Sequence, residues 1–155
     1  MRHFFSLVGL ALWLAACSGE TPASQDIQTL TLRAEDGRTG ELTLEVAQTP
    51  DEKARGLSKR QNLDGIDGML FVLAEGDPSA VWMKDTWISL DVAFLDEGGY
   101  VLRVYEALEP EDETIVDCAC SAAFMLEVAG GRSERLGLEP GATLDVAGLQ
   151  SGPPR

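Results

Sequence analysis

The segment Trp82-Met83-Lys84-Asp85-Thr86 gathers residue types that are suited to binding a ligand. On extended backbone Trp82 and Lys84 share one face, so the lysine stem can lie along the indole ring with its ammonium near the π face. Asp85 and Thr86 carry short polar side chains that close turns by accepting hydrogen bonds from backbone N–H groups. The segment therefore predicts a cation held over an aromatic ring, beside a turn.

Asp91 is a second candidate, because it lies between Leu90 and Val92 in an apolar run. A carboxylate in such a strand loses water and needs a partner, which Lys84 or Arg55 can supply. Two interpretations stay open, a structural ion pair that locks the sheet and a ligand site. A catalytic site is a third interpretation with a weaker signal, since one lysine with one or two aspartates occurs in many sequences. The candidate ligand-binding residues are Arg55, Trp82, Lys84, Asp85, Thr86 and Asp91.

Cys118 and Cys120 flank Ala119 and allow three interpretations. Residues two apart on a strand place their Cα atoms near the upper limit for a disulfide, so a bridge requires bent backbone and is expected to be easily reduced. Free thiols and a soft-metal site for Cu(I) are the alternatives. The acidic run at 109–117 disfavours a thiolate, which argues against a nucleophilic cysteine.

The composition excludes several function classes. The single histidine is His3, within a segment that we expect to be removed, so histidine-based catalysis, zinc ligation and pH switching are not expected. Acid–base chemistry must then come from carboxylates, lysine or tyrosine. A formal net charge of −14 argues against nucleic acid and anionic lipid surfaces as partners. We expect no cofactor and no metal ligand set, apart from the copper alternative.

The N-terminal segment indicates where the protein resides. Arg2 and an apolar run to Ala16 precede Cys17, and residues 1–16 resemble a bacterial lipoprotein signal peptide. The resemblance implies cleavage before Cys17 and acylation of its thiol and new amino group, which would anchor the protein in the cell envelope, facing the periplasm or outside. We expect a flexible tether at 17–26, a single globular domain at 27–150 and a tail at 151–155.

The elements that must position these residues are mostly strands. Alternating apolar residues around the turn at Asp36-Gly37 predict a β-hairpin at 30–46. Thr49, Pro50 and Glu52 predict a short capped helix that ends at Gly56. Ser133 is expected to cap a second short helix at 133–136. The remaining strands are expected at Met69–Leu73, Ala80–Met83, Ile88–Leu95, Tyr100–Tyr105, Ala122–Val128 and Thr143–Val146. The predicted fold is mainly β (α+β), a compact small barrel-like sheet with two short helices.

Six sequence blocks occur in the order found in one family. From about Leu42 to Val146 the chain resembles the bacterial and archaeal family catalogued as domain of unknown function 192. Ser58, Asp85 and Ser89 depart from the family's usual methionine, asparagine and proline. The resemblance supports the fold and leaves the function open. The blocks are Arg55-Gly56-Leu57, Gly68-Met69-Leu70-Phe71, the 82–86 segment, Leu90-Asp91, Phe94-Leu95-Asp96, and Leu126-Glu127 followed by Gly130, Glu134-Arg135-Leu136-Gly137-Leu138 and Gly141.

These observations favour an envelope-anchored lipoprotein that acts as a ligand-binding or accessory module and not as an enzyme. Its expected partners are the membrane, through the lipid anchor, and a small molecule or polymer of the envelope. Arg55 and Lys84 stand out in so acidic a chain and point to an anionic ligand. The alternatives are a small carboxylate-based hydrolase of an envelope polymer and copper handling through Cys118 and Cys120. Two carboxylates converging in an open cleft would favour the hydrolase.

Overall fold

The computed structural model describes residues 26–149. Within them the chain forms mostly strands, and the two helices are only six and four residues long. The mainly β fold with two short helices is therefore confirmed. Residues 1–16, Cys17 and the tail at 151–155 lie outside the described residues, and β1 begins at the last residue of the expected tether. The elements are β1 (Asp26–Arg33), β2 (Thr39–Ala47), α1 (Pro50–Arg55), β3 (Gly68–Val72), β4 (Ala80–Val81), β5 (Leu90–Leu95), β6 (Val101–Leu108), β7 (Val116–Asp117), β8 (Phe124–Ala129), α2 (Ser133–Leu136) and β9 (Thr143–Leu144).

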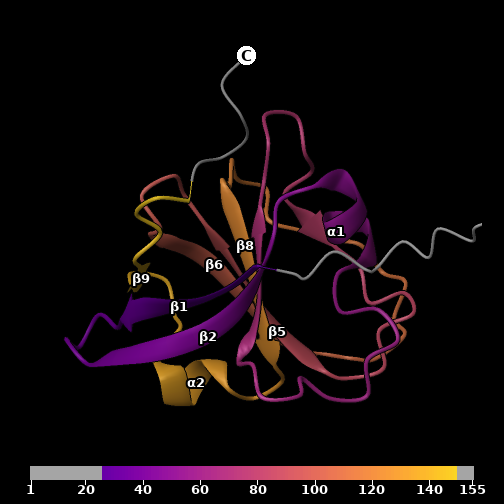
Figure 1. The fold of residues 1–155 in the computed structure, drawn as a ribbon, viewed down its shortest axis with the longest axis horizontal. Coiled ribbons are helices and arrows are strands. Elements are labelled where there is room, and N and C mark those ends of the chain that lie inside the picture. The colour runs from indigo at the N-terminus through magenta and orange to yellow at the C-terminus, as the bar shows by residue number, and fades with distance from the viewer. Residues whose placement is uncertain (1–25, 150–155) are drawn as a thin grey trace, which may run out of the picture.

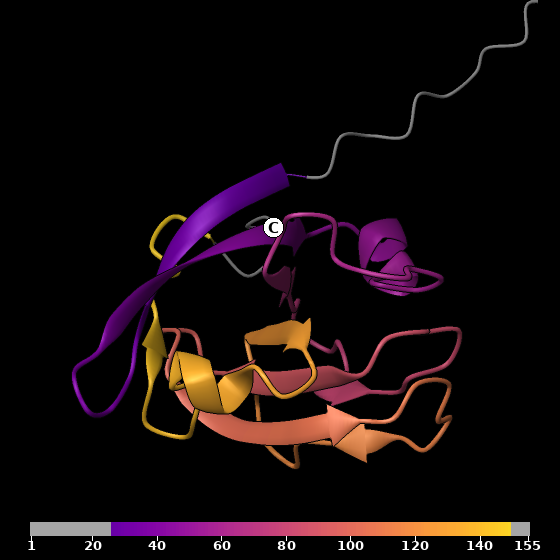
Figure 2. The ribbon, with the colours of Figure 1, turned by 90° about the horizontal axis from the view of Figure 1, so that it is seen from below.

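The principal sheet has the strand order β6-β5-β8-β3-β2-β1-β9 and curls into a half-barrel. Its two ends meet at one corner, where Tyr100 bridges Thr143 and the Leu144 amide donates to the Gly99 carbonyl at 2.9 Å. Figure 2 shows the indigo hairpin of β1 and β2 on one side and the later, pink-to-orange strands on the other. The expected barrel-like sheet is confirmed.

The N-terminal hairpin follows directly from its alternating sequence. β1 and β2 pair antiparallel with Leu30 opposite Leu42, so the leucines of both strands share the inner face. Gly37 has a φ of 86°, the left-handed conformation that its turn requires. Local chemistry was therefore sufficient to predict both the strands and the turn.

Helix α1 lies in the crossover between β2 and β3. Thr49 Oγ1 accepts from the Glu52 amide at 3.3 Å, and the Glu52 carboxylate accepts from the Thr49 amide at 2.9 Å, which is the expected capping box. Gly56 ends the helix as expected. The strands on either side of α1 run parallel, and this pairing was not expected from the sequence. Parallel neighbours need such a crossover.

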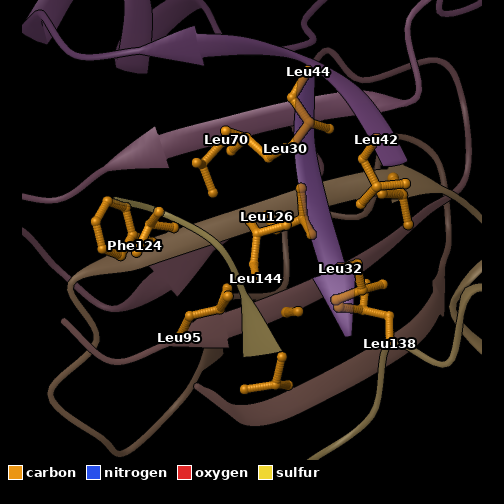
Figure 3. Close-up of a cluster of buried hydrophobic side chains, with 14 of the residues drawn as sticks. Leu30, Leu32, Leu42, Leu44, Leu70, Leu95, Phe124, Leu126, Leu138 and Leu144 are labelled. Carbon is orange, nitrogen blue, oxygen red and sulfur yellow. The ribbon is translucent and has the colours of Figure 1, made fainter. Parts of the chain in front are cut away.

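The inner face of the half-barrel holds the larger apolar cluster, shown in Figure 3. Leucines from β1, β2, β3, β5, β8 and β9 converge there with Phe124, and Leu138 adds a contact from beyond α2. Burial of this many aliphatic groups supplies the main stabilisation of a domain of this size. The labelled members are Leu30, Leu32, Leu42, Leu44, Leu70, Leu95, Phe124, Leu126, Leu138 and Leu144.

A second apolar cluster covers the outer face of β3, β5 and β8. These three strands are buried on both faces, so their sequences are nearly continuous apolar runs without alternation. Helix α1 lies on the far side of the molecule from α2, as Figure 1 shows. The outer cluster comprises Ala47, Leu57, Met69, Phe71, Leu73, Val81, Met83, Leu90, Val92, Phe94, Cys118 and Met125.

Three local expectations are corrected. The strand expected at Ala80–Met83 ends at Val81, and the strand expected from Ile88 begins at Leu90, because residues between them turn. Ser133 is not the N-cap of α2; Arg132 takes that place without a side-chain cap, and the Ser133 amide donates to Asp91. Among residues 26–149 no helix is long and apolar enough to cross a membrane.

Candidate ligand-binding pocket

A pocket of about 340 Å³ opens between α1 and the outer face of the sheet. Residues of α1 and the turn after it form one side, β3 and β8 supply the floor, and the chain around β4 forms the other side. This volume lies within the range of small-molecule sites. The lining residues are Pro50, Lys53, Ala54, Arg55, Gly56, Leu57, Ser58, Phe71, Leu73, Asp77, Pro78, Ala80, Val81, Trp82, Lys84, Thr86, Met125 and Glu127.

The walls of the pocket are largely apolar. Leu57, Phe71, Leu73 and Met125 line it and belong to the buried outer cluster. Gly56 has a φ of 48°, and a Cβ added there would lie 3.3 Å from the Phe71 ring. A glycine is therefore needed where the end of α1 approaches the floor. A ligand in this pocket would bury an apolar part against the sheet.

Lysine and arginine side chains from α1 differ in what they contact. Lys53 forms an ion pair with Asp77 and donates to the Val72 carbonyl at 3.2 Å. The hydrogen bond from Lys53, with a further one from the Ala74 amide, lowers the pKa of Asp77 below its usual value. The Arg55 guanidinium is exposed and forms no ion pair with any residue of the described part. Arg55 is therefore available to a ligand.

Lys84 lies over Trp82 at the mouth of the pocket, as the sequence predicted. Its Nζ is 5.2 Å from the centroid of the indole ring, within the range of a cation–π contact. The nearest carboxylate is Glu113, with Oε1 3.9 Å from Nζ, and both side chains are well exposed. Such an exposed pair contributes little to stability. The ammonium can therefore turn toward a bound anion.

The turn after Trp82 separates two of the predicted site residues. Asp85 has a φ of 55° and is exposed, outside the pocket, while its carbonyl accepts from the Lys59 amide at 2.7 Å. Aspartate and asparagine tolerate this left-handed conformation, so the side chain at position 85 suits the turn. Thr86 is buried and lines the pocket. Of the six predicted residues, Arg55, Trp82, Lys84 and Thr86 come together.

Asp91 does not belong to the pocket, and its predicted pairing with Lys84 or Arg55 is wrong. Its carboxylate accepts three backbone hydrogen bonds, from Ala107 at 2.8 Å, Gly131 at 3.0 Å and Ser133 at 2.8 Å. Burial raises the pKa of Asp91, but these hydrogen bonds outweigh it, and the pKa lies below its usual value. The carboxylate joins β5 to a bulge in β6 and to the start of α2.

Glu127, like Lys53 and Asp77, lines the pocket but was not predicted from the sequence. It lines the pocket from β8, its exposed fraction is 5%, and it has no hydrogen bond or ion pair with any residue in 26–149. Burial raises the pKa of Glu127 to about 8. The signal was present, because Glu127 interrupts an apolar run, just as Asp91 does. That apolar run did not indicate which face of β8 lines a pocket.

Cys118 and Cys120 form a disulfide in the structure, with Cα atoms 5.1 Å apart. The intervening Ala119 has a φ of 52°, so the backbone is bent between the two cysteines. Its amide donates to Asp117 at 2.6 Å, which holds this bend. No group of three or more His, Cys, Asp and Glu side chains in the described part of the chain is arranged to hold a metal ion.

The chain belongs to the family described as uncharacterized ACR, COG1430 (domain of unknown function 192), whose model matches residues 31–146. It is similar to a solved structure from Sinorhizobium meliloti described as a "putative transcription regulator", with 35% identity and a TM-score of 0.78, over 83% of this chain and 100% of that one. A protein of unknown function from Novosphingobium aromaticivorans is also similar, with 32% identity and a TM-score of 0.72, over 81% and 89% of the two chains. No curated protein is similar enough to count as a match.

Proposed function

We propose that this protein is a binding module for a small anionic ligand with an apolar part, held at the cell envelope by lipid on Cys17. One observation carries the binding proposal: an apolar pocket whose floor contains a buried carboxyl group, with no partner in the described part of the chain, and whose mouth carries Arg55 and Lys84. A pocket with apolar walls and a few polar groups is typical of small-molecule sites. The family itself has no established activity to add to this argument.

The charge around the pocket supports an anion. Lys53 and Asp77 neutralise each other, which leaves Arg55 and Lys84 as the positive charges at the mouth. In a chain with a formal net charge of −14, two such cations beside a concave site create a local field that attracts negative ligands. The same overall charge argues against nucleic acid, so the regulator description of the similar structure is not extended to this chain.

The envelope location rests on the N-terminal segment alone. The basic start, short apolar run and small residues before Cys17 support lipidation at that cysteine. A Cys17→Ser variant should then leave the protein either unprocessed or soluble. In a detergent phase separation the wild-type chain should enter the detergent phase, and its recovery from the aqueous phase would contradict the anchor.

Native mass spectrometry of the full chain, extracted in mild detergent, tests the binding proposal. We expect a small molecule that copurifies with wild type and is lost from an Arg55→Ala/Lys84→Ala double variant. Arg33→Ala is the matched control, because Arg33 is exposed on β1 and does not line the pocket. Equal occupancy in the wild-type and double-variant proteins would show that the ligand binds elsewhere.

Carboxylate-based hydrolysis of an envelope polymer is a second candidate function, favoured by one observation. Asp77 and Glu127 line the same pocket, and the pKa of Asp77 is lowered while that of Glu127 is raised. Opposite shifts of two carboxyl groups are typical of acid–base pairs in enzymes. Release of soluble products from purified cell-wall polymer, abolished in Glu127→Gln, would favour this function, and no release would favour the binding module.

A further inference from the structure

We propose that the pocket binds an organic carboxylate whose oxygen accepts a hydrogen bond from neutral Glu127, so that ligand binding is coupled to protonation of that side chain. This inference rests on the proposed binding function and specifies its ligand class and its control by pH. The Glu127 side chain has no hydrogen-bond or ion-pair partner within residues 26–149. A buried carboxyl group in that condition is costly unless a bound molecule completes its hydrogen bonding.

The position of Glu127 in the sheet explains why its carboxyl group has no partner among residues 26–149. Glu127 lies opposite Met69 on β3 and opposite Val92 on β5, and both neighbours are fully buried apolar residues. One strand further, Glu45 lies opposite Met69 and is paired with Arg60 at 2.9 Å. The cross-strand row therefore places apolar side chains on both sides of the carboxyl group. The remaining direction is the pocket.

The charged groups around the pocket do not neutralise Glu127. Helix α1 contributes Lys53, which is paired with Asp77, and Arg55, which is exposed. The segment after β4 contributes Lys84, which lies over Trp82 and 3.9 Å from Glu113. Were one of these cations close to the carboxyl oxygens, it would favour the ionised form. Burial instead raises the pKa of Glu127 to about 8, so the neutral form dominates at pH 7.

A neutral carboxyl group selects its ligand by donating. Its O–H is the donor on the pocket floor, and a ligand oxygen must accept from it. A carboxylate is a strong charged acceptor, and two carboxyl groups in contact share one proton more favourably than they carry two charges. The field of Arg55 and Lys84 favours the negative charge of such a ligand over a cation. A cationic ligand would instead require ionised Glu127 and would pass both cations on entry.

Three small probes with the same aromatic body separate these cases: phenylacetate, the uncharged phenylacetamide and the cationic phenethylamine. Titration calorimetry on the full chain in mild detergent should show that phenylacetate binds most tightly at pH 6.5. Its affinity should fall about thirtyfold by pH 9.5, because the neutral form of Glu127 becomes scarce. Measurements in two buffers of different ionisation enthalpy should show uptake of about one proton per ligand at the higher pH.

Glu127→Gln provides the decisive variant. An amide still donates a hydrogen bond but does not titrate, so phenylacetate binding should persist and lose its pH dependence. Glu127→Leu should weaken phenylacetate at least tenfold while leaving the domain folded, which a thermal melt checks. Arg55→Ala should weaken binding at every pH without changing the pH profile.

Two results would overturn the inference while leaving the proposed function intact: an unchanged pH profile in Glu127→Gln, or tighter binding of phenethylamine than of phenylacetate. Absence of binding by all three probes would also overturn the carboxylate inference. A copurified ligand in the native mass spectra would still support the binding function in that case, and its absence there would contradict both.

Discussion

Asp91 and Glu127 are two buried carboxyl groups on neighbouring strands, and their surroundings are opposite. Asp91 on β5 is fully buried and accepts three backbone hydrogen bonds, while Glu127 on β8 is nearly as buried and has no partner among the described residues. The pKa of Asp91 is lowered, and that of Glu127 is raised to about 8. Burial alone therefore does not set the charge of a carboxyl group; the number of donors aimed at it does.

This difference separates a carboxyl group that stabilises the fold, Asp91, from one that lines the pocket, Glu127. We call the first a framework group and the second a site group. The Asp91 carboxylate accepts hydrogen bonds from amides in a β6 bulge and at the start of α2, so it stabilises the fold. Glu127 contributes nothing comparable to the fold and lines the pocket instead. A polar side chain kept in a core without structural partners is a candidate for function. Substitutions at Asp91, Glu127 and Lys84 test this distinction, and their expected effects on stability decrease in that order.

Asp91→Ala should destabilise the domain by about 3–5 kcal/mol, because it leaves the buried Ser133 amide and the part-buried Ala107 and Gly131 amides without their acceptor. Urea unfolding at pH 7 measures this loss. Glu41→Ala is the control, since Glu41 is exposed on β2, and it should change stability by less than about 0.5 kcal/mol. A loss as small as that of the control would show that Asp91 is not a framework group.

Glu127→Gln should stabilise the domain at pH 9 by about 2–4 kcal/mol and leave it no more stable than wild type at pH 4. Because folding raises the pKa of Glu127 from 4.5 to about 8, the stability that this group contributes is fully present below pH 4.5 and is lost as the pH rises from there through 8. That loss amounts to about 5 kcal/mol at 1.36 kcal/mol per unit, from which the burial of an amide subtracts about 1–3 kcal/mol. Thermal melts between pH 4 and 9 measure the difference. Parallel pH profiles for the two proteins would contradict the assignment.

Acid should weaken the framework through Asp91 in the opposite direction. Because folding lowers the pKa of Asp91, its stabilisation is present above the ordinary aspartate pKa and is lost as the pH falls through the folded value. Asp91→Asn, which has no carboxylate to protonate, should lose less stability than wild type between pH 5 and 2. Urea midpoints across this range measure the effect, and equal acid losses would assign it to other carboxylates.

Lys84→Met should change stability by less than about 1 kcal/mol, the smallest expected effect. Its ammonium is exposed, its ion-pair distance to Glu113 is long, and neither buried carboxyl group depends on it. The same variant should weaken binding of the anionic probe. Strong destabilisation would mean that Lys84 does compensate a buried carboxylate, which would remove the distinction drawn between Asp91 and Glu127.

Much of the fold and part of the site could be predicted from local pattern. The leucine alternation around Gly37 specified the hairpin, and Thr49 with Glu52 specified the start of α1, because both depend on neighbours within a few residues. The stacking of Lys84 on Trp82 has the same local origin. The ends of strands that are buried on both faces, such as β5, were predicted less accurately. The sequence of such a strand is a continuous apolar run without alternation.

By itself the sequence determined the mainly β class, the short helices and the set of polar residues that the chain offers for binding. Only the tertiary structure decided that β2 and β3 run parallel and that Asp91 meets three amides. It also decided that the pocket opens onto Glu127. The physical reason is that Asp91 and Glu127 look alike in sequence, as single charges in apolar strands. Their charge states depend on donors brought from segments as far as 42 residues away, or on the absence of any among the described residues.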